Sequence, residues 1–249
     1  MGLFSVFAEA LGFNNQVGRS TSSAGVTPAP TKQIGGEIGY FGLEQWWLKE
    51  LSEADRRLIR ARYGPIGTYS NNDPLTSGQI FTTSQSAASW LAGLAGWFKP
   101  AVAKEADLIL RIADKAWRVN ESSSRARSAD AIFARHLAWG ALSKIYYRFR
   151  EKPEYLDRSL EAANRQIAMQ AQAANAWRQK QWNLARSTGK PPTSFDLPSH
   201  AGYKRMAIVL EKDNQFDQAL ALVREAKAAG WNGDWDKRIE RLKRKLKSS

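Results

Sequence analysis

The chain of 249 residues carries 37 Lys and Arg against 24 Asp and Glu, a formal net charge of +13, so we expect acidic partners. It has no cysteine, which excludes disulfides, thiolate nucleophiles and cysteine-bound metals and fits a cytoplasmic protein. Its two histidines lie at no metal-ligand spacing, so we predict neither a metal nor a cofactor. No run reaches the roughly 20 apolar residues that a membrane span needs.

The N-terminal residues divide into an apolar segment and a polar one. Residues 1–13 are predicted to form a short amphipathic helix, suited to docking or to a weak membrane contact, whose apolar side consists of Leu3, Phe4, Phe7 and Leu11. No basic residue precedes this segment, so we do not expect a secretory signal. Residues 14–39 are rich in Ser, Thr, Gly, Pro and Gln, a composition that buries too little surface to offset the entropy of ordering. We therefore predict a disordered linker at 14–39.

A helical N-terminal region is predicted for residues 40–130. The run 42–48 looks helical and contains two adjacent tryptophans. Ser52 and Asp55 then form the two ends of a capping box, and the helix that they open is expected to stop before residue 64. Apolar residues at helical spacing predict two further helices, at Thr83–Phe98 and Ala101–Arg118.

Residues 131–249 are expected to form a second helical region. Helical spacing continues through Ala129–Arg150, Pro153–Met169 and Ala171–Ala185. The long loop Ser187–Ser199, which holds three prolines, is expected to be a functional or mobile connection. Because no alternating run is long enough to demand a strand, we predict an all-α fold.

One helix-turn-helix unit stands out at residues 200–233, and a third helix, Asp234–Leu246, follows it. The residues Asp213-Asn214-Gln215 are expected to make the tight turn between the two helices of the unit. A degenerate second copy is expected at Ala138–Arg150 and Pro153–Met169, in which Tyr146 and Tyr147 lie where a small residue would be expected. Bulky and small apolar residues recur through the unit at Tyr203, Met206, Ala207, Leu210, Phe216, Ala219, Val223 and Ala226.

This spacing resembles the tetratricopeptide repeat, a unit of about 34 residues with a large residue early in its first helix and small residues where its helices cross. The resemblance implies helical hairpins stacked in a short array, because a single repeat cannot bury its own faces. It departs from the family where Gly230-Trp231 replaces the proline that stops the second helix. The order of segments along the whole chain also resembles uncharacterised bacterial proteins, which implies no particular activity.

The resemblance also implies a binding surface. In the repeat family, basic residues on the first helix of a unit line a groove and clamp acidic groups of a peptide. Lys204 and Arg205 fall at such positions, with Lys212 nearby, whereas Ile208 occupies the place of the family's asparagine. We predict a non-catalytic adaptor that binds an acidic peptide or protein through these residues. A solvated basic face is the alternative interpretation.

A second hypothesis is association with nucleic acid through basic helices. The C-terminal helix carries a dense set of cations, of which Arg238, Arg241 and Lys245 are the predicted phosphate contacts, together with the arginines of 56–62. Cations near a helix C-terminus are also favoured by the helix dipole, which needs no ligand. The ten tryptophans are expected mainly in the core, not as platforms for base stacking. Membrane docking by residues 1–13 is a third and weaker hypothesis.

Catalysis is not expected. His136 lies mid-helix among apolar residues, which is typical of a satisfied buried histidine, and His200 stands at a helix start, where a structural role suffices. The chain has no glycine-rich phosphate loop after a strand and no nucleophile elbow. We therefore predict no catalytic residues.

Overall fold

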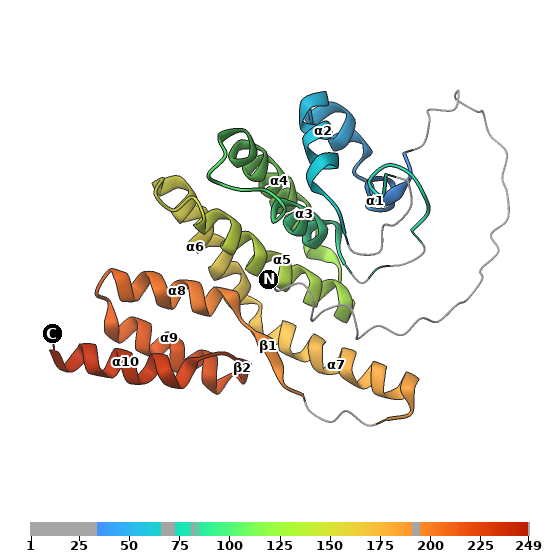
Figure 1. The fold of residues 1–249 in the computed structure, drawn as a ribbon. Coiled ribbons are helices and arrows are strands. Elements are labelled where there is room, and N and C mark those ends of the chain that lie inside the picture. The colour runs from blue at the N-terminus through green and yellow to red at the C-terminus, as the bar shows by residue number, and fades with distance from the viewer. Residues whose placement is uncertain (1–33, 66–72, 81–82, 84, 191–194, 249) are drawn as a thin grey trace. The chain divides into compact units, whose positions relative to one another are not determined.

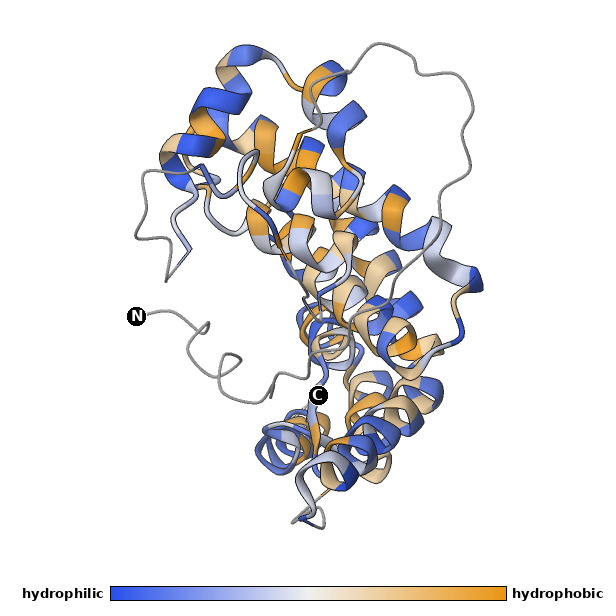
Figure 2. Cartoon of the chain, turned by 90° about the vertical axis from the view of Figure 1, so that its right-hand side faces the viewer, coloured by the Kyte–Doolittle hydropathy of each residue, from blue (hydrophilic) through white to orange (hydrophobic). Residues whose placement is uncertain are grey.

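The computed structural model describes residues 34–65, 73–80, 83, 85–190 and 195–248. Ten α-helices, α1 to α10, and two short strands are found in this part of the chain (Figure 1). The all-α prediction is therefore confirmed. Hydrophobic and hydrophilic residues alternate along most helices (Figure 2), as expected for helices that bury one face. None of the described helices has both the length and the apolar character needed to cross a membrane.

The first described helix, α1 (Gly36–Tyr40), corrects the extent of the predicted linker. The prediction of disorder as far as residue 39 is wrong for residues 36–39, which are helical. Ile38 is fully buried, and its N–H donates to the carbonyl of Leu75 at 2.9 Å. A segment distant in sequence thus orders a stretch whose composition is polar. The helix predicted at 1–13 and the rest of the linker lie outside the described residues.

The next elements confirm the predicted capping box. After a π-helical turn (Trp46–Glu50), whose two tryptophans are buried, comes α2 (Glu53–Arg62). The Asp55 N–H donates to Ser52 Oγ at 3.1 Å, and the Ser52 N–H donates to Asp55 Oδ2 at 2.9 Å. These reciprocal bonds satisfy two of the N–H groups that a helix start leaves free. Helix α2 ends before residue 64, as predicted.

Three helices surround the first hydrophobic core. These are α3 (Ala87–Ala95), α4 (Ala103–Ser122) and α5 (Ala129–Tyr147), with a short 3₁₀ turn (Ser123–Arg125) before α5; each of the three packs on the other two. Trp117 and Trp139 meet edge to face in this core, with ring centroids 4.8 Å apart. The prediction that the tryptophans pack in the core is confirmed by the burial of Trp46, Trp90, Trp117 and Trp139.

The C-terminal helices pack on α5 and on one another. They are α6 (Pro153–Ala168), α7 (Gln170–Thr188), α8 (Ala201–Lys212), α9 (Phe216–Ala228) and α10 (Trp235–Ser248). Helix α5 contacts α6, α7 and α8, while α8 packs on α9 and α9 on α10. The second core lies among these helices and buries the indole of Trp231. Helix α5 therefore touches both the N-terminal and the C-terminal groups of helices.

The helix-turn-helix unit predicted at 200–233 is present as α8 and α9. Asn214 makes the turn between them with a φ of 57°, a left-handed conformation that asparagine tolerates better than most residues. The small and bulky positions predicted to face the neighbouring helix are almost completely buried at Tyr203, Ala207, Ala219, Val223 and Ala226. The sequence pattern thus identified the buried face of this hairpin correctly.

Two short strands were not predicted. Strand β1 (Leu197–Ser199) pairs in parallel with β2 (Trp231–Asn232), with Leu197 opposite Trp231. Strands of two and three residues are too short to show an alternating pattern, so sequence periodicity carries no signal for them. The ladder joins the entry to α8 with the exit from α9, and it converts the end of the predicted loop Ser187–Ser199 into regular structure.

Candidate functional site

Helices α5 and α8 approach closely at a junction that α6 completes. Gln166 of α6 lies between them, and its Oε1 accepts a hydrogen bond from the Gly202 N–H at 2.7 Å. A Cβ at Gly202 would lie 2.7 Å from the Ala163 carbonyl oxygen. A Cβ at Gly140 of α5 would lie 2.5 Å from the Gln166 amide nitrogen. Because the atom that faces Gly202 belongs to the backbone, the close approach of α8 to α6 depends on glycine at that position.

The two histidines of the chain meet at this junction. His136 of α5 and His200 at the start of α8 are buried, and their Nε2 atoms lie 3.1 Å apart. His200 Nδ1 accepts a hydrogen bond from the Tyr203 N–H at 3.2 Å, so it caps α8 as expected of a residue at a helix start. The Trp231 ring stacks on His136 with centroids 4.9 Å apart. The pair therefore fastens α8 to α5 inside the second core.

These contacts assign the protons of the pair. Because His200 Nδ1 is an acceptor, its proton is on Nε2, which donates to His136 Nε2. The proton of His136 is then on Nδ1, which is buried and has no hydrogen-bond partner among the described residues. The prediction of a satisfied His136 therefore holds for only one of its two ring nitrogens. The contact between the two histidines, which stand 64 residues apart in the chain, was not predicted.

Both histidines are neutral at neutral pH. Burial lowers the pKa of His136 to about 3. Burial, followed by the charge that His136 would carry, lowers the pKa of His200 to about 2. A protonated imidazole would place a charge in an apolar core with no carboxylate in contact with either ring. The junction between α5 and α8 is thus held together by uncharged rings.

Further along the same two helices, basic side chains gather around the ring of Tyr147. The guanidinium carbon of Arg205 lies 3.4 Å from the ring centroid, and that of Arg150 lies 4.8 Å from it. Lys212 Nζ lies 5.9 Å from the same centroid. A cation over an aromatic face is attracted by the negative face of the ring. We call this group the Tyr147 basic cluster, and it consists of Lys144, Tyr147, Arg150, Lys204, Arg205 and Lys212.

Like charges lie close together within the Tyr147 basic cluster. Desolvation, and then the charges of Lys204 and Arg205, lower the pKa of Lys144. Burial, to which the charge of Arg150 adds, lowers the pKa of Arg205, although Tyr147 offsets part of this effect. The Nε atom of Arg205 is buried and has no hydrogen-bond partner among the described residues. The fold therefore holds these cations together against their mutual repulsion.

Carboxylates that would neutralise the cluster are scarce. Glu151 pairs with Arg150 at 3.5 Å, but the Glu151 side chain is 84% exposed, so solvent screens this pair. Lys204 helps to lower the pKa of Asp234, for which Arg238 is the main cause. Among the described residues, no carboxylate lies within ion-pair distance of Lys144, Lys204, Arg205 or Lys212.

The structure brings the three predicted partner-binding residues to one place. Arg205 and Lys212 share the Tyr147 ring, and Lys204 lies close enough to Lys144 to affect its pKa. The contribution of Lys144 and Tyr147 of α5, and of Arg150 in the turn after it, was not predicted. A signal was present, since Tyr147 stands where the repeat pattern expects a small residue and basic residues flank it at Lys144, Arg148, Arg150 and Lys152. These residues form one site with Arg205 only because α8 packs on α5, and that packing is not visible in the sequence.

The residues of α10 that were predicted to contact nucleic acid are already paired with acids. Arg238 is only 6% exposed, and its Nε donates to Asp234 Oδ1 at 2.9 Å, so its guanidinium is engaged inside the chain. Arg241 makes two hydrogen bonds to Glu211, at 2.8 and 2.6 Å. Lys245 lies 3.2 Å from the same carboxylate. These three cations are therefore engaged by acids of the chain itself.

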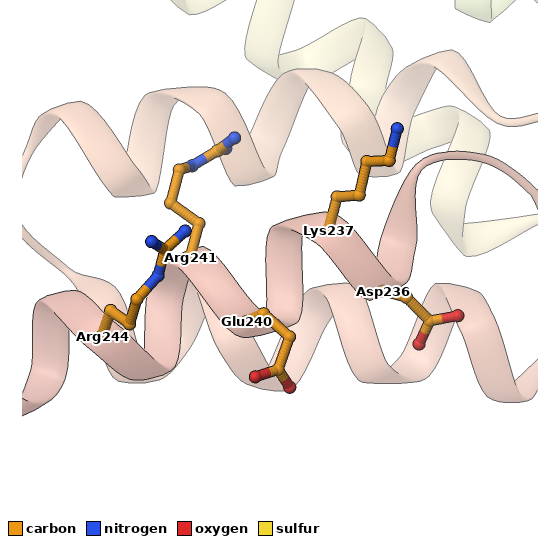
Figure 3. A pocket seen from close by; sticks show the side chains of 5 residues that line it. All are labelled: Asp236, Lys237, Glu240, Arg241 and Arg244. Atoms are coloured by element: carbon orange, nitrogen blue, oxygen red, sulfur yellow. The ribbon is translucent and has the colours of Figure 1, made fainter.

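The outer surface of α10 also mixes both signs of charge. A hollow of about 540 Å³ on this helix is lined by Asp236, Lys237, Glu240, Arg241 and Arg244. Figure 3 shows that Lys237 and Arg241 extend from one side of the helix, while Glu240 extends from the other. Because acids alternate with bases, this surface presents no uniform positive field to a chain of phosphates.

The arginines of α2 are engaged as well. Arg56 donates to the backbone carbonyls of Trp47 and Leu51. The other three pair with acidic side chains, namely Arg57 with Glu53, Arg60 with Asp73 and Arg62 with Glu105. Their roles in the fold account for the basic character of this helix without a ligand.

Comparisons with known proteins place the chain in no family. No family model matches it, and neither a curated protein nor a solved structure does. The resemblance to the tetratricopeptide repeat therefore stays a prediction, and the structure defines the class of the protein as all-α. In the described residues, no group of three or more histidine, aspartate or glutamate side chains is arranged to hold a metal ion.

Proposed function

We propose that the protein is a non-catalytic adaptor that binds an acidic peptide, or an acidic segment of another protein, through the Tyr147 basic cluster. The observation that carries the proposal is the convergence of Arg150, Arg205 and Lys212 on one tyrosine ring. A bound carboxylate would reduce the electrostatic repulsion among these cations, and this reduction favours binding.

The position of Arg205 supports the same proposal. Its guanidinium lies over the Tyr147 ring and its Nε is buried, so the planar group is held in one orientation. A guanidinium fixed in this way loses little further side-chain entropy when it binds a carboxylate. The surface is therefore organised before the ligand arrives.

Binding without chemistry is supported by the placement of the histidines. Both are buried and their pKa values are lowered to about 3 and about 2, so neither is poised to exchange a proton with a ligand near neutral pH. The pairing of Arg238, Arg241 and Lys245 with acids favours the adaptor over the nucleic-acid hypothesis.

The proposal is tested with a short fluorescein-labelled polyglutamate peptide and fluorescence anisotropy. The charge reversal Lys204→Glu with Arg205→Glu is compared with Lys237→Glu and Arg244→Glu, two exposed residues of α10 that give the same change in net charge. We expect the first pair to weaken binding by about tenfold or more, which corresponds to about 1.4 kcal/mol, and the second pair to change it little. Equal weakening by both pairs would show that only net charge matters and would overturn the proposal.

A further inference from the structure

We propose that the Tyr147 basic cluster recognises a phosphate monoester, carried on a phosphorylated serine or threonine of the partner protein. This inference rests on the proposed function, because it names the anion that the same site would take. A phosphomonoester carries a charge of about −1.5 to −2 at pH 7 and offers three acceptor oxygens, whereas a carboxylate carries one charge and two oxygens.

The number of cations in the cluster favours a ligand with two negative charges over one with a single charge. Lys144, Arg150, Lys204, Arg205 and Lys212 gather at one end of the α5–α8 contact, and only Arg150 has an ion pair with a carboxylate among the described residues. A single carboxylate would leave most of this excess charge unrelieved. A dianion with three oxygens can accept hydrogen bonds from the Arg205 fork and from lysines on both helices at once.

The chemical variety of the donors supports the same anion. Arg205 presents a planar group fixed against Tyr147, while the lysine ammonium groups are mobile point charges on flexible stems. Ile208, on the same helix between Arg205 and Lys212, provides no hydrogen-bond donor in its side chain. The charged donors that the cluster offers a ligand are therefore the arginine forks and the lysine ammonium groups.

The local extent of the cluster favours a phosphorylated side chain over a nucleic acid. A nucleic acid offers phosphates in a regular series and needs cations along a stripe. The helix that carries most of the remaining C-terminal cations, α10, has Arg238, Arg241, Lys243 and Lys245 paired with acids. The charges of the Tyr147 basic cluster converge on one ring, which suits one isolated phosphate group.

The test compares three fluorescein-labelled glycine-rich peptides that differ only in the central residue, which is phosphoserine, glutamate or serine. With the full chain at pH 7.5, we expect the phosphoserine peptide to bind about tenfold more tightly than the glutamate peptide. The serine peptide should bind weakest. Inorganic phosphate should compete with the phosphoserine peptide, and Lys204→Glu with Arg205→Glu should abolish the preference while Lys237→Glu with Arg244→Glu keeps it.

A second, milder variant separates the loss of phosphate recognition from a loss of the fold. Lys144→Gln with Lys204→Gln removes two exposed charges and leaves the Arg205–Tyr147 contact in place, so the fold should survive while the preference for phosphoserine falls several-fold. Circular dichroism checks each variant. An unchanged preference in this variant would overturn the proposal.

The remaining outcomes separate the two proposals. Equal binding of the phosphoserine and glutamate peptides, lost in Lys204→Glu with Arg205→Glu, would overturn the phosphate inference and leave the adaptor proposal standing. If the protein bound neither the phosphoserine and glutamate peptides nor polyglutamate, both the phosphate inference and the adaptor proposal would be contradicted. Binding to phosphatidate vesicles without binding to the phosphoserine peptide would assign the phosphate to a lipid headgroup and would overturn the assignment to a protein partner.

Discussion

The Tyr147 basic cluster and helix α10 contain the same kinds of residue in opposite circumstances. On α10, Arg238, Arg241 and Lys245 each face a carboxylate, and Arg238 is buried with its partner Asp234. In the cluster, Arg205 and Lys212 face an aromatic ring and other cations. A count of lysines and arginines ranks α10 first as an anion-binding surface. The neighbours of each cation reverse that order, because a cation already paired with an acid has little left to offer a ligand.

The largest effect is expected from acid, because the α5–α8 junction beside the cluster contains two buried, neutral histidines. The pKa values of His136 and His200 in the folded state, about 3 and about 2, lie below the ordinary 6.5. Between the folded-state values and 6.5, the unfolded state binds more protons than the folded state, so the free energy of unfolding falls as the pH is lowered below 6.5. From pH 6.5 to 4.5 the pair should remove up to about 5 kcal/mol from the free energy of unfolding.

Urea denaturation at several pH values measures this dependence. His136→Gln removes one titrating group. The slope of the free energy of unfolding against pH between 4.5 and 6.5 should therefore decrease by the equivalent of close to one proton taken up on unfolding. The same dependence in the variant and in the unmodified protein would mean that the histidine pair does not control the acid response.

A smaller effect is expected from crowding the junction that sets α8 against α5. Gly202→Ala places a Cβ 2.7 Å from the Ala163 carbonyl oxygen, and backbone must shift to accept it. We expect a loss of about 1–3 kcal/mol in stability, together with weaker binding of the polyglutamate peptide. Gly93→Ala in α3 is the matched control, since the added methyl meets open space and alanine favours the helix. Equal loss in both variants would contradict the assigned role of Gly202.

The smallest effect is expected from releasing the cations of α10. Glu211→Gln removes the carboxylate that pairs with Arg241 and Lys245. The variant should bind a short DNA duplex a few-fold more tightly than the unmodified protein, and the slope of the logarithm of affinity against the logarithm of salt concentration should steepen by about one. Filter binding over a salt series measures both. An unchanged affinity in Glu211→Gln would mean that pairing with Glu211 does not limit the binding of phosphate by Arg241 and Lys245.

Local features of this chain could be predicted, and long-range contacts could not. The capping box at Ser52 and the buried face of the α8–α9 hairpin depend on residues a few positions apart, so periodicity and local hydrogen bonding reveal them. Helix α1 was missed because its order comes from a backbone contact with Leu75. The basic residues of α8 could be grouped from the sequence for the same reason, since their spacing along one helix is a local property.

The remaining contacts join residues on different helices, so they depend on how the helices pack against one another. The His136–His200 pair joins residues 64 positions apart, and Arg241 finds Glu211 at a separation of 30. Neither pair leaves a pattern in a single sequence. Tyr147 was visible only as a departure from the repeat, and its function as a support for Arg205 follows from the packing of α8 on α5.

The central claim is tested most directly by following the arginine side chains themselves. Nitrogen-15 NMR observes the Nε–H groups of Arg205 and Arg241 in one spectrum, and Arg205→Lys and Arg241→Lys assign the two signals. On titration with the polyglutamate peptide at neutral pH, the Arg205 signal should shift in a saturable manner while the Arg241 signal stays in place, because Glu211 already holds Arg241. A shift of the Arg241 signal with an unmoved Arg205 signal would contradict the account.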